Sequence, residues 1–573
     1  MTETAAPGLA APAQTDVSHR VSHTTTDWWR SAVIYQVYPR SFADHSGNGV
    51  GDLRGIIDRL PYLSDLGVDA LWLNPFYCSP QNDAGYDVAN YYEVDPLFGS
   101  TRDAEELIIR AHELNLRVIF DIVPNHTSIE HAWFRQALLT APGSAAWNRY
   151  HCVRGLGEDG SRPPNDWRSV FGGSGWSQIL DPDTAEPTGW WYLHLFDATQ
   201  PDLNWDHEDV RAEHEQVLKF WFDRGVDGFR IDVAHGLVKS PGYPFSGESD
   251  RVLGVADDVP VLPQWDQPGV HDVYRSWRRL ADSYDPPRVF CGEVWVSTPE
   301  AQAQYLRPDE LHTAFNFHYL KTRWDAEHLR ETIDHSLATA DSVSAPCTWV
   351  LSNHDVWRHV SRLAPENPQG NQDLSTGMAR ARAASLIMLA LPGSAYLYQG
   401  EELGLPEVLD LPAQSRQDPI FARTDGAALG RDGCRVPLPW TAQPPTFGFN
   451  STGQSWLPQP DMWGELSVET QLRDADSCLS MYRQALALRA DESIFNEGTL
   501  EWLSSPVDTI AFRRPGRDSV IAVMNLSDEP LTWMAQKLLL ASSSQVTAEP
   551  STQNHALGLV VTLAPNTAAW VRE

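Results

Sequence analysis

The chain has 573 residues, of which 42% are hydrophobic and 21% charged, as expected of a folded globular protein. It carries 43 basic and 76 acidic residues, and the net charge of −33 argues against nucleic acid or an anionic membrane surface as a partner. No apolar run is long enough to predict a transmembrane helix. The six cysteines stand singly without a CxxC pair, which favours a reduced, cytoplasmic protein without structural zinc.

Residues 1–26 are small and polar and lack the basic start and apolar run of a secretory signal, so we expect a disordered lead-in. Apolar runs then predict strands at 32–38, 70–73 and 117–123, with helices at 56–66 and 101–115 between them. Because the strands are continuously apolar and alternate with helices, they predict a parallel sheet that is covered on both faces.

The alternation stops over 125–204, a stretch rich in Gly, Pro, Trp and Asp that is too long for a loop and predicts an inserted subdomain. It resumes with a helix at 210–222 and strands at 228–232, 288–293, 314–317, 348–351 and 395–398, followed by a helix at 469–489. Eight strands predict a (β/α)₈ TIM barrel over 27–124 and 205–495. Short β-runs at 509–512, 520–524 and 558–563 predict a C-terminal antiparallel β-sandwich over 496–573.

Three carboxylates, Asp232, Glu293 and Asp355, stand at or just beyond the ends of predicted strands. Active sites of such barrels lie at the carboxyl ends of the strands. A single acid there would be explained by an ion pair, but three acids at one barrel mouth favour catalysis, because buried charges are costly without partners.

Two carboxylates can cleave a glycosidic bond, one as nucleophile and one as general acid, and a third can stabilise the cationic transition state. The acid needs a raised pKa to hold its proton near neutral pH. Arg230 precedes Asp232 by two residues and therefore shares its strand face, where we expect it to keep Asp232 ionised.

Four motifs occur in order along the barrel: DIVPNH at 121–126, GFRID at 228–232, GEVW at 292–295 and LSNHD at 351–355. With them the chain resembles the α-amylase family of glycoside hydrolases (glycoside hydrolase family 13), in its α-glucosidase and oligo-1,6-glucosidase branch. QPDLN at 200–204 resembles the motif that marks the oligo-1,6-glucosidases. The resemblance runs from about residue 28 to the C-terminus.

The resemblance implies that Asp232 is the nucleophile of a covalent β-glucosyl intermediate, Glu293 the general acid/base and Asp355 the ligand of the sugar 2- and 3-hydroxyls. It further implies supporting roles at the first glucose subsite, in which Arg230 orients the nucleophile, His126 and His354 hydrogen-bond the glucose, and Asp121 supports the site structurally.

The same resemblance implies that Tyr86 stacks under the terminal glucose and that Asp87 holds its 4-hydroxyl, with Arg435 as partner. Such a charged pair would close the pocket beyond the first sugar and make the enzyme exo-acting, whereas a plain loop salt bridge is the alternative. Phe171 resembles an aromatic residue that borders the aglycone subsite, although a place in the core of the insert explains it equally well.

A glycine-rich acidic loop covers residues 44–52. Oxygen ligands at alternate positions suit Ca²⁺ or Mg²⁺, and the branch that the chain resembles carries Ca²⁺ in this loop. Asp44, Asn48, Val50 and Asp52 would be the ligands of a structural ion, and an empty turn is the alternative, since Ser46 replaces the usual Asn or Asp. We expect no cofactor for catalysis.

Val233, directly after the nucleophile, goes with α-1,6 preference in the branch, whereas AHG at 234–236 and AFNF at 314–317 resemble enzymes that accept maltose-like substrates. One pocket contact contributes only about 1–3 kcal/mol, so the linkage stays open. We therefore expect an exo-acting, retaining α-glucosidase that acts on small α-glucosides or oligosaccharides, and the sequence leaves its oligomeric state open.

The sequence leaves three alternatives. A transglucosylase or trehalose-forming mutase would pass the glucosyl group to a sugar instead of water, and a sucrose hydrolase is a second option. The arginine-rich loop of sucrose isomerases is not apparent, because HYLKTR stands at 318–323. A catalytically inactive transporter-associated chain would lack catalytic acids and carry a transmembrane helix, unlike this chain.

Overall fold

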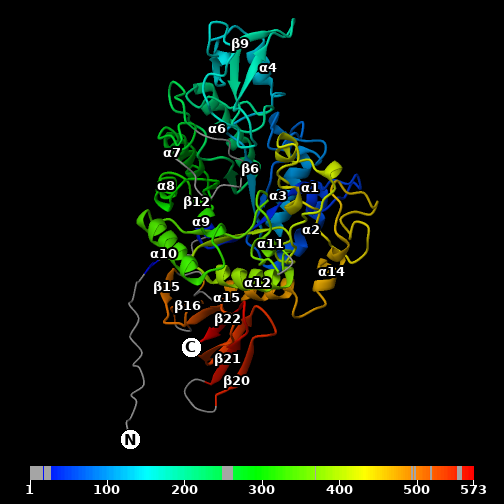
Figure 1. Cartoon of the computed structure of the whole chain (residues 1–573), viewed down its shortest axis with the longest axis vertical. Helices are drawn as coiled ribbons and strands as arrows, with labels where there is room; N and C mark the ends of the chain where they lie inside the picture. The colour runs from blue at the N-terminus through cyan, green and yellow to red at the C-terminus, as the bar shows by residue number, and fades with distance from the viewer. Residues whose placement is uncertain are drawn as a thin grey trace.

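The computed structural model describes residues 17–18, 27–247, 262–367, 370–491, 495, 498–516, 519–551 and 558–573. Three regions follow each other along the long axis: the insert around β9, a central barrel, and a C-terminal β domain (Figure 1). The expected disordered lead-in lies outside the described residues, with one exception. Residues Val17–Ser18 form strand β1, which pairs antiparallel with β15 (Thr499–Trp502).

The central sheet contains eight parallel strands in the order β12-β11-β10-β6-β3-β2-β14-β13. They are β2 (Val33–Val37), β3 (Ala70–Leu73), β6 (Arg117–Ile122), β10 (Gly228–Ile231), β11 (Val289–Gly292), β12 (Thr313–Ala314), β13 (Thr348–Val350) and β14 (Ser394–Tyr398). Between the two end strands, the backbone N–H of Asn316 donates to the carbonyl of Thr348 at 3.0 Å. This contact brings the ends of the sheet together, so the predicted TIM barrel is confirmed.

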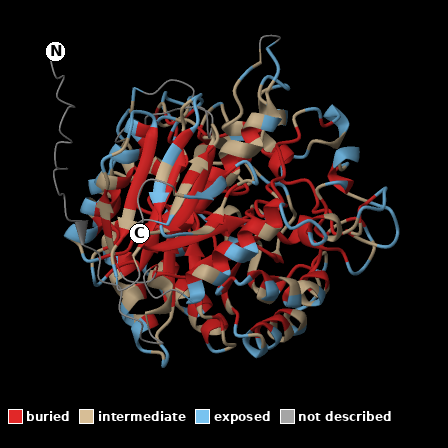
Figure 2. Ribbon diagram, turned by 90° about the horizontal axis from the view of Figure 1, so that it is seen from below, coloured by how far each residue is buried: buried red, intermediate tan, exposed pale blue. Residues whose placement is uncertain are grey.

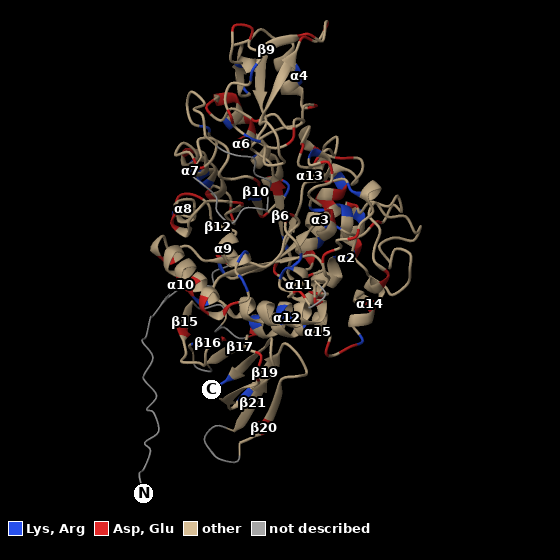
Figure 3. Ribbon diagram, viewed as in Figure 1, with Lys and Arg blue, Asp and Glu red and all other residues tan. Residues whose placement is uncertain are grey.

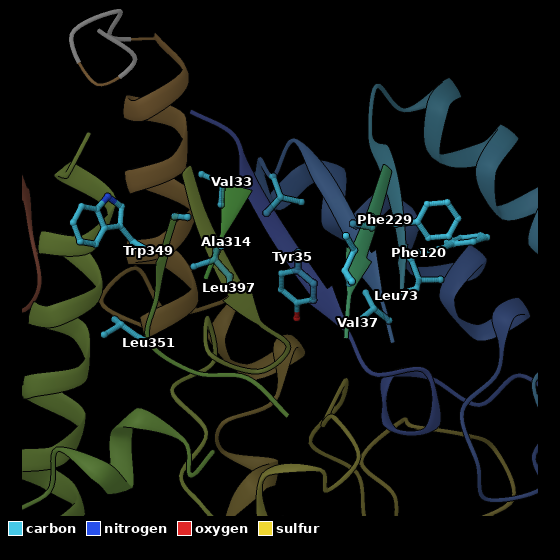
Figure 4. Close-up of a cluster of buried hydrophobic side chains, with 14 of the residues drawn as sticks. Val33, Tyr35, Val37, Leu73, Phe120, Phe229, Ala314, Trp349, Leu351 and Leu397 are labelled. Carbon is cyan, nitrogen blue, oxygen red and sulfur yellow. The ribbon is translucent and has the colours of Figure 1, made fainter. Parts of the chain in front are cut away.

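Helices surround the barrel and cover the outer face of its strands, while side chains fill the inner face. The longer ones are α2 (Leu53–Leu66), α3 (Thr101–Glu113), α6 (Glu208–Phe222), α7 (Val270–Asp282), α10 (Ala326–Ser342) and α12 (Leu374–Ala390). Every residue of β2, β3 and β10 is buried, and Figure 4 shows Val33, Tyr35 and Leu397 among the core side chains. Because both faces are covered, the strands read as continuous apolar runs in the sequence.

Two predicted elements were wrong in extent. The helix expected over 469–489 is divided into α14 (Val468–Gln471) and α15 (Cys478–Asp491), because the Ser477 hydroxyl accepts the Ser480 N–H at 3.1 Å and so starts a new helix. The strand expected over 314–317 ends at Ala314. Asn316 instead caps α9 (Phe317–Leu320), accepting the Tyr319 N–H at 3.0 Å.

The insert between β6 and β10 contains a three-stranded antiparallel sheet of β7 (Cys152–Arg154), β8 (Trp176–Leu180) and β9 (Pro187–Leu193), with helices α4 (Ala132–Leu138) and α5 (Ala145–Asn148). Acidic and basic residues are spread over the insert, the barrel and the C-terminal domain (Figure 3). Within the described part of the chain, no helix is both long and apolar enough to cross a membrane.

The C-terminal domain has a six-stranded sheet, β1-β15-β16-β17-β22-β19, and a three-stranded sheet, β18-β21-β20. Besides β1 and β15 these strands are β16 (Thr509–Arg514), β17 (Val520–Asn525), β18 (Leu531–Ala535), β19 (Lys537–Ala541), β20 (Thr547–Pro550), β21 (Leu559–Leu563) and β22 (Thr567–Arg572). One buried cluster joins Val523 and Val571 of the first sheet to Val561 of the second, so the sheets pack face to face. Figure 2 views the molecule from this end and shows buried strands.

Candidate active site

Arg230 is the centre of a buried cluster of carboxylates at the ends of β6, β10 and β11. Its Nη1 donates to Asp121 Oδ1 at 2.9 Å and to Asp232 Oδ1 at 2.8 Å, and its Nη2 donates to Glu293 Oε2. The register of β10 with β6 sets Arg230 beside Asp121, while Asp232 and Glu293 each follow the last residue of their strand. The guanidinium of Arg230 therefore donates hydrogen bonds to three carboxylates.

The Glu293 carboxylate is also held from two other sides. Its Oε1 accepts the indole N–H of Trp295 at 2.8 Å, and its Oε2 accepts the backbone N–H of Val233 at 3.2 Å. The backbone N–H of Ala234 donates to the carbonyl of Glu293 at 2.9 Å. The turn after the predicted nucleophile thus binds the predicted acid/base directly.

Burial raises the pKa of Asp232 well above its usual range. Arg230 lowers this pKa, as expected, but the nearby carboxylate of Glu293 raises it again. Arg230 opposes this rise in pKa through its hydrogen bond to Asp232, and its predicted part in keeping Asp232 ionised stays a prediction. Burial likewise raises the pKa of Asp121 to about 7. Close carboxylates that cannot all ionise hold a proton between them, and a general acid needs such a proton.

Unlike Asp232, Asp355 lies in an environment that lowers the pKa of its carboxyl group. Its Oδ1 accepts from Arg431 Nη1 at 3.1 Å and from Arg435 Nη2 at 3.0 Å, and its Oδ2 lies 3.3 Å from His354 Nε2. Although burial disfavours the charge, His354 and the arginines hold the pKa of Asp355 well below its usual range. Two arginines thus favour the ionised form of Asp355, which suits the stabilisation of a cationic transition state.

Tyr86 and His354 lie together beside this anion. Their rings stack with centroids 5.3 Å apart, and the Tyr86 hydroxyl lies 2.7 Å from His354 Nε2 and donates to Asp121 Oδ2 at 3.1 Å. His126 Nε2 lies 3.2 Å from the Tyr86 carbonyl. Burial lowers the pKa of His126 to about 4, so its ring is neutral at pH 7. The three residues that the resemblance places at the first glucose subsite are therefore brought together.

The predicted partnership of Asp87 with Arg435 is wrong. The Asp87 carboxylate accepts from the Ser79 hydroxyl at 2.8 Å and from the backbone N–H of Asn82 at 2.8 Å, so it shapes its own loop. The charged pair is formed instead by Asp83 and Arg431, whose Oδ1 and Nη2 are 2.8 Å apart.

Sequence reasoning missed Asp83 and Arg431, which lie in the same two segments as Asp87 and Arg435. The signal was present, since each segment offers two residues of the required charge four positions apart. Only the fold shows which of the two aspartates reaches which of the two arginines.

Phe171 of the insert joins this charged cluster. Its ring is fully buried, with the Arg431 guanidinium 5.0 Å from its centroid and the Phe196 ring at 5.7 Å. Nearby, Arg423 in the segment after β14 donates to the Gly172 carbonyl at 2.7 Å. The insert and the segment after β14 thus meet, and they close the site on the side of Asp83 and Arg431.

A second missed residue is Lys239, one of only four lysines in the chain. Its buried ammonium lies 2.8 Å from Asp202 Oδ2 and 2.9 Å from Asn125 Oδ1, and it also donates to the Gly236 carbonyl. It therefore ties the 200–204 motif to the ends of β6 and β10.

The predicted metal loop forms a compact turn. Asp44 Oδ2 accepts the Gly49 N–H at 2.8 Å, Asp52 Oδ2 accepts the Ser46 N–H at 2.9 Å, and Asn48 Oδ1 accepts the Val50 N–H at 2.8 Å. These oxygens lie in one turn and are hard ligands of the kind that Ca²⁺ prefers. Each of them, however, already accepts a hydrogen bond from a backbone N–H group. Among the described residues no group of three or more His, Cys, Asp or Glu is arranged to hold a metal. The structural ion stays a prediction.

Comparison with known proteins agrees with this geometry. The family model described as "Alpha amylase, catalytic domain" matches residues 36–498. The chain belongs to the α-amylase family. As a member with three acids on the ends of its barrel strands, it is a glycoside hydrolase.

A probable alpha-glucosidase of Rhizobium meliloti is 36% identical over 521 residues, covering 88% of this chain and 90% of that protein. A trehalose-6-phosphate hydrolase of Bacillus subtilis is 35% identical, covering 87% and 90%. The crystal structure of an alpha-glucosyl transfer enzyme, XgtA, superposes with a TM-score of 0.81 at 34% identity, covering 95% of this chain and 99% of that one.

Proposed function

We propose that this protein is an exo-acting, retaining α-glucosidase that releases α-glucose from the non-reducing end of short α-linked gluco-oligosaccharides or α-glucosides. The observation that carries the proposal is that the carboxylates of Asp232 and Glu293 bind the same guanidinium, that of Arg230. Inverting enzymes separate their carboxyl groups by about 6.5–9.5 Å to admit a water, whereas retaining enzymes hold them about 5–5.5 Å apart. Side chains this close favour the retaining mechanism.

In the first step Asp232 attacks the anomeric carbon while Glu293 gives its proton to the leaving oxygen. The bond to the leaving group breaks, and a β-glucosyl ester forms on Asp232. The developing positive charge on the ring is stabilised by the Asp355 anion. In the second step Glu293 takes a proton from water, which attacks the same carbon and releases α-glucose and the Asp232 carboxylate.

The contact between Asp83 and Arg431 supports the exo-acting part of the proposal. Arg431 binds both Asp83 and Asp355, so the charged pair adjoins the acid that would hold the first sugar. Phe171 and Arg423 join the insert to the same segment. A longer chain has no passage on that side, and the charged groups offer hydrogen bonds to terminal hydroxyls.

The test is product analysis by NMR after separate incubation with maltose, isomaltose, trehalose, trehalose 6-phosphate and sucrose. We expect α-glucose as the first anomer, and the relative rates then assign the linkage. Initial release of β-glucose would overturn the retaining mechanism. Failure of every substrate would overturn the proposed class, and Asp232→Asn serves as the inactive control.

Transfer to a second sugar is a further candidate, supported by the 34% identity to the alpha-glucosyl transfer enzyme. New disaccharides at high substrate concentration, with little free glucose, would favour it. We also propose a cytoplasmic location, which is supported by the six cysteines being free thiols.

A further inference from the structure

The residue directly after the nucleophile has an unusual backbone. Val233 has a φ of +47°, and it is the only β-branched residue among the described positions with φ in the left-handed region. A branched side chain disfavours this conformation, which costs about 1–3 kcal/mol and persists only where the surroundings enforce it. Some feature of the structure must therefore hold Val233 in place.

That feature is a hydrophobic cluster of the insert, here called the insert core: Trp167, Trp176, Leu193 and Leu195, together with Val233 and Trp265. Val233 is only 4% exposed. Gly236 packs so tightly here that an added Cβ would lie 2.7 Å from Val233 Cγ1 and 2.9 Å from Trp265 Cζ3. The side chain of Val233 is thus buried in a cluster that tryptophans and leucines of the insert form together with Trp265, although its backbone belongs to the barrel.

The insert also forms hydrogen bonds to the segment that follows this turn. The Trp167 indole N–H donates to the Pro244 carbonyl at 2.8 Å, and Asn165 Nδ2 donates to the Tyr243 carbonyl at 3.1 Å. Asn165 Oδ1 in turn accepts the Trp176 indole N–H at 2.7 Å. The polar ends of both tryptophans are therefore fixed, which makes the insert core a rigid support.

The left-handed turn has a chemical consequence, because it directs the Val233 N–H to Glu293 Oε2 at 3.2 Å. We propose that the insert core is a positioning device for the acid/base: by anchoring Val233 it maintains the strained turn whose N–H holds the Glu293 carboxylate. Val233 is thus a positioning residue, in addition to any effect of its size on linkage choice. This inference rests on the proposed function, since it assigns Glu293 the role of acid/base.

The physical effect follows from hydrogen bonding to a carboxylate. An N–H donor favours the ionised form, which Glu293 adopts after it has protonated the leaving group. Losing the donor also frees the carboxylate to move, and small displacements of catalytic groups reduce rates strongly. The deficit should be larger for a disaccharide than for p-nitrophenyl α-glucoside, because a good leaving group needs less help from the acid.

The experiment compares Val233→Ala with Val233→Gly. Alanine removes the anchor, while its Cβ still disfavours positive φ, so we expect the turn to relax; glycine adopts positive φ without steric cost. We expect Val233→Ala to lower kcat on the disaccharide roughly tenfold with KM within about threefold, and to move the alkaline limb of the kcat profile to higher pH. Val233→Gly should recover most of this loss and restore the profile, although its side chain is smaller still.

Trp176→Phe should reproduce the direction of the Val233→Ala effect. The matched control is Trp190→Phe, since Trp190 contacts Trp147 edge-on at 5.6 Å in another part of the insert and should leave kcat and its pH profile unchanged. If a thermal melt shows that Val233→Ala does not fold, kcat and its pH profile are compared between Trp176→Phe and Trp190→Phe instead.

A loss that increases steadily from alanine to glycine would overturn the inference, because it would follow side-chain volume rather than backbone conformation. So would a Val233→Ala enzyme with an unchanged kcat and pH profile. A wild-type enzyme that hydrolyses no α-glucoside would instead overturn the proposed function, so the two failures are distinguishable.

Discussion

Arg431 donates to Asp83 at 2.8 Å, although the two residues are 348 positions apart in the chain. The same guanidinium donates to Asp355 Oδ1 at 3.1 Å. One arginine therefore joins the loop between β4 (Tyr77–Cys78) and β5 (Asn90–Val94) to the acid that follows β13, at the point where the site is closed. This contact is the structural basis on which an exo-acting enzyme is proposed.

Asp83→Asn tests that basis, because it removes the charge with little change in shape. We expect KM for maltose to rise about tenfold, corresponding to about 1.4 kcal/mol, and activity on maltotriose to improve relative to maltose. Steady-state kinetics with both sugars measure this. Asp197→Asn is the matched control, since Asp197 pairs with Arg423 at 3.1 Å in the same region; equal effects of both variants would contradict a specific role for Asp83.

Asp232→Asn should abolish turnover, by about 10³-fold or more, because an amide cannot form the glucosyl ester. The melting temperature should stay within a few degrees of wild type, because the amide is nearly isosteric with the carboxyl group. Rate measurements with an aryl glucoside and a thermal melt check both points. Activity near wild type would remove Asp232 from the nucleophile role.

Glu293→Gln should separate substrates by their leaving groups. Loss of the acid should slow maltose hydrolysis by about 10²–10⁴-fold, while the first half-reaction of an aryl glucoside with a low-pKa phenol suffers less. Stopped-flow detection of the phenol burst isolates this step. An equal loss for both substrates would show that Glu293 does not donate the proton.

The barrel also contains buried carboxylates that the reaction does not use. Burial raises the pKa of Glu401 to about 8 and that of Glu407 to about 7. A carboxyl group whose pKa is higher in the folded than in the unfolded state stabilises the fold at low pH, and this contribution is lost as pH rises through the folded value. We therefore expect the melting temperature to fall between about pH 4.5, the pKa of an unfolded glutamate, and about pH 8.

Glu401→Gln should reduce that fall, because glutamine is neutral at every pH and can still accept from the Tyr482 hydroxyl, which lies 2.9 Å from Glu401 Oε1. Thermal melts across the pH range give the comparison. Glu158→Gln, at an exposed position, serves as the control and should follow wild type. Parallel curves for wild type and Glu401→Gln would contradict the assignment.

The loop of residues 44–52 gives a prediction about calcium. If it binds the ion, adding Ca²⁺ to EDTA-treated protein should raise the melting temperature with concentration, since a ligand specific for the folded state stabilises it by RT ln(1 + [L]/Kd). Asn48→Ala should weaken the response without disturbing α2, which is capped by Asp52 instead. A melting temperature insensitive to both EDTA and Ca²⁺ would leave the loop a plain turn.

Much of the fold could be read from the sequence, because its signals are local. The run at 70–73 is a strand with the predicted bounds, β6 and β10 end one residue earlier than predicted, and β2 is one residue shorter at each end. Predictions failed where a single polar side chain decides the outcome. Ser477 and Asn316 each start a helix by accepting one N–H, which interrupts an otherwise continuous apolar pattern.

The sequence by itself determined that acids end several strands of a parallel barrel, since apolar runs and charged ends are properties of adjacent residues. Only the tertiary structure decided that Arg431 pairs with Asp83, that burial and Glu293 raise the pKa of Asp232, and that Val233 is anchored in the insert. Each of these depends on groups from distant segments meeting in a space that excludes water. Pairing, desolvation and backbone strain are therefore set by the packed fold and not by any local run of residues.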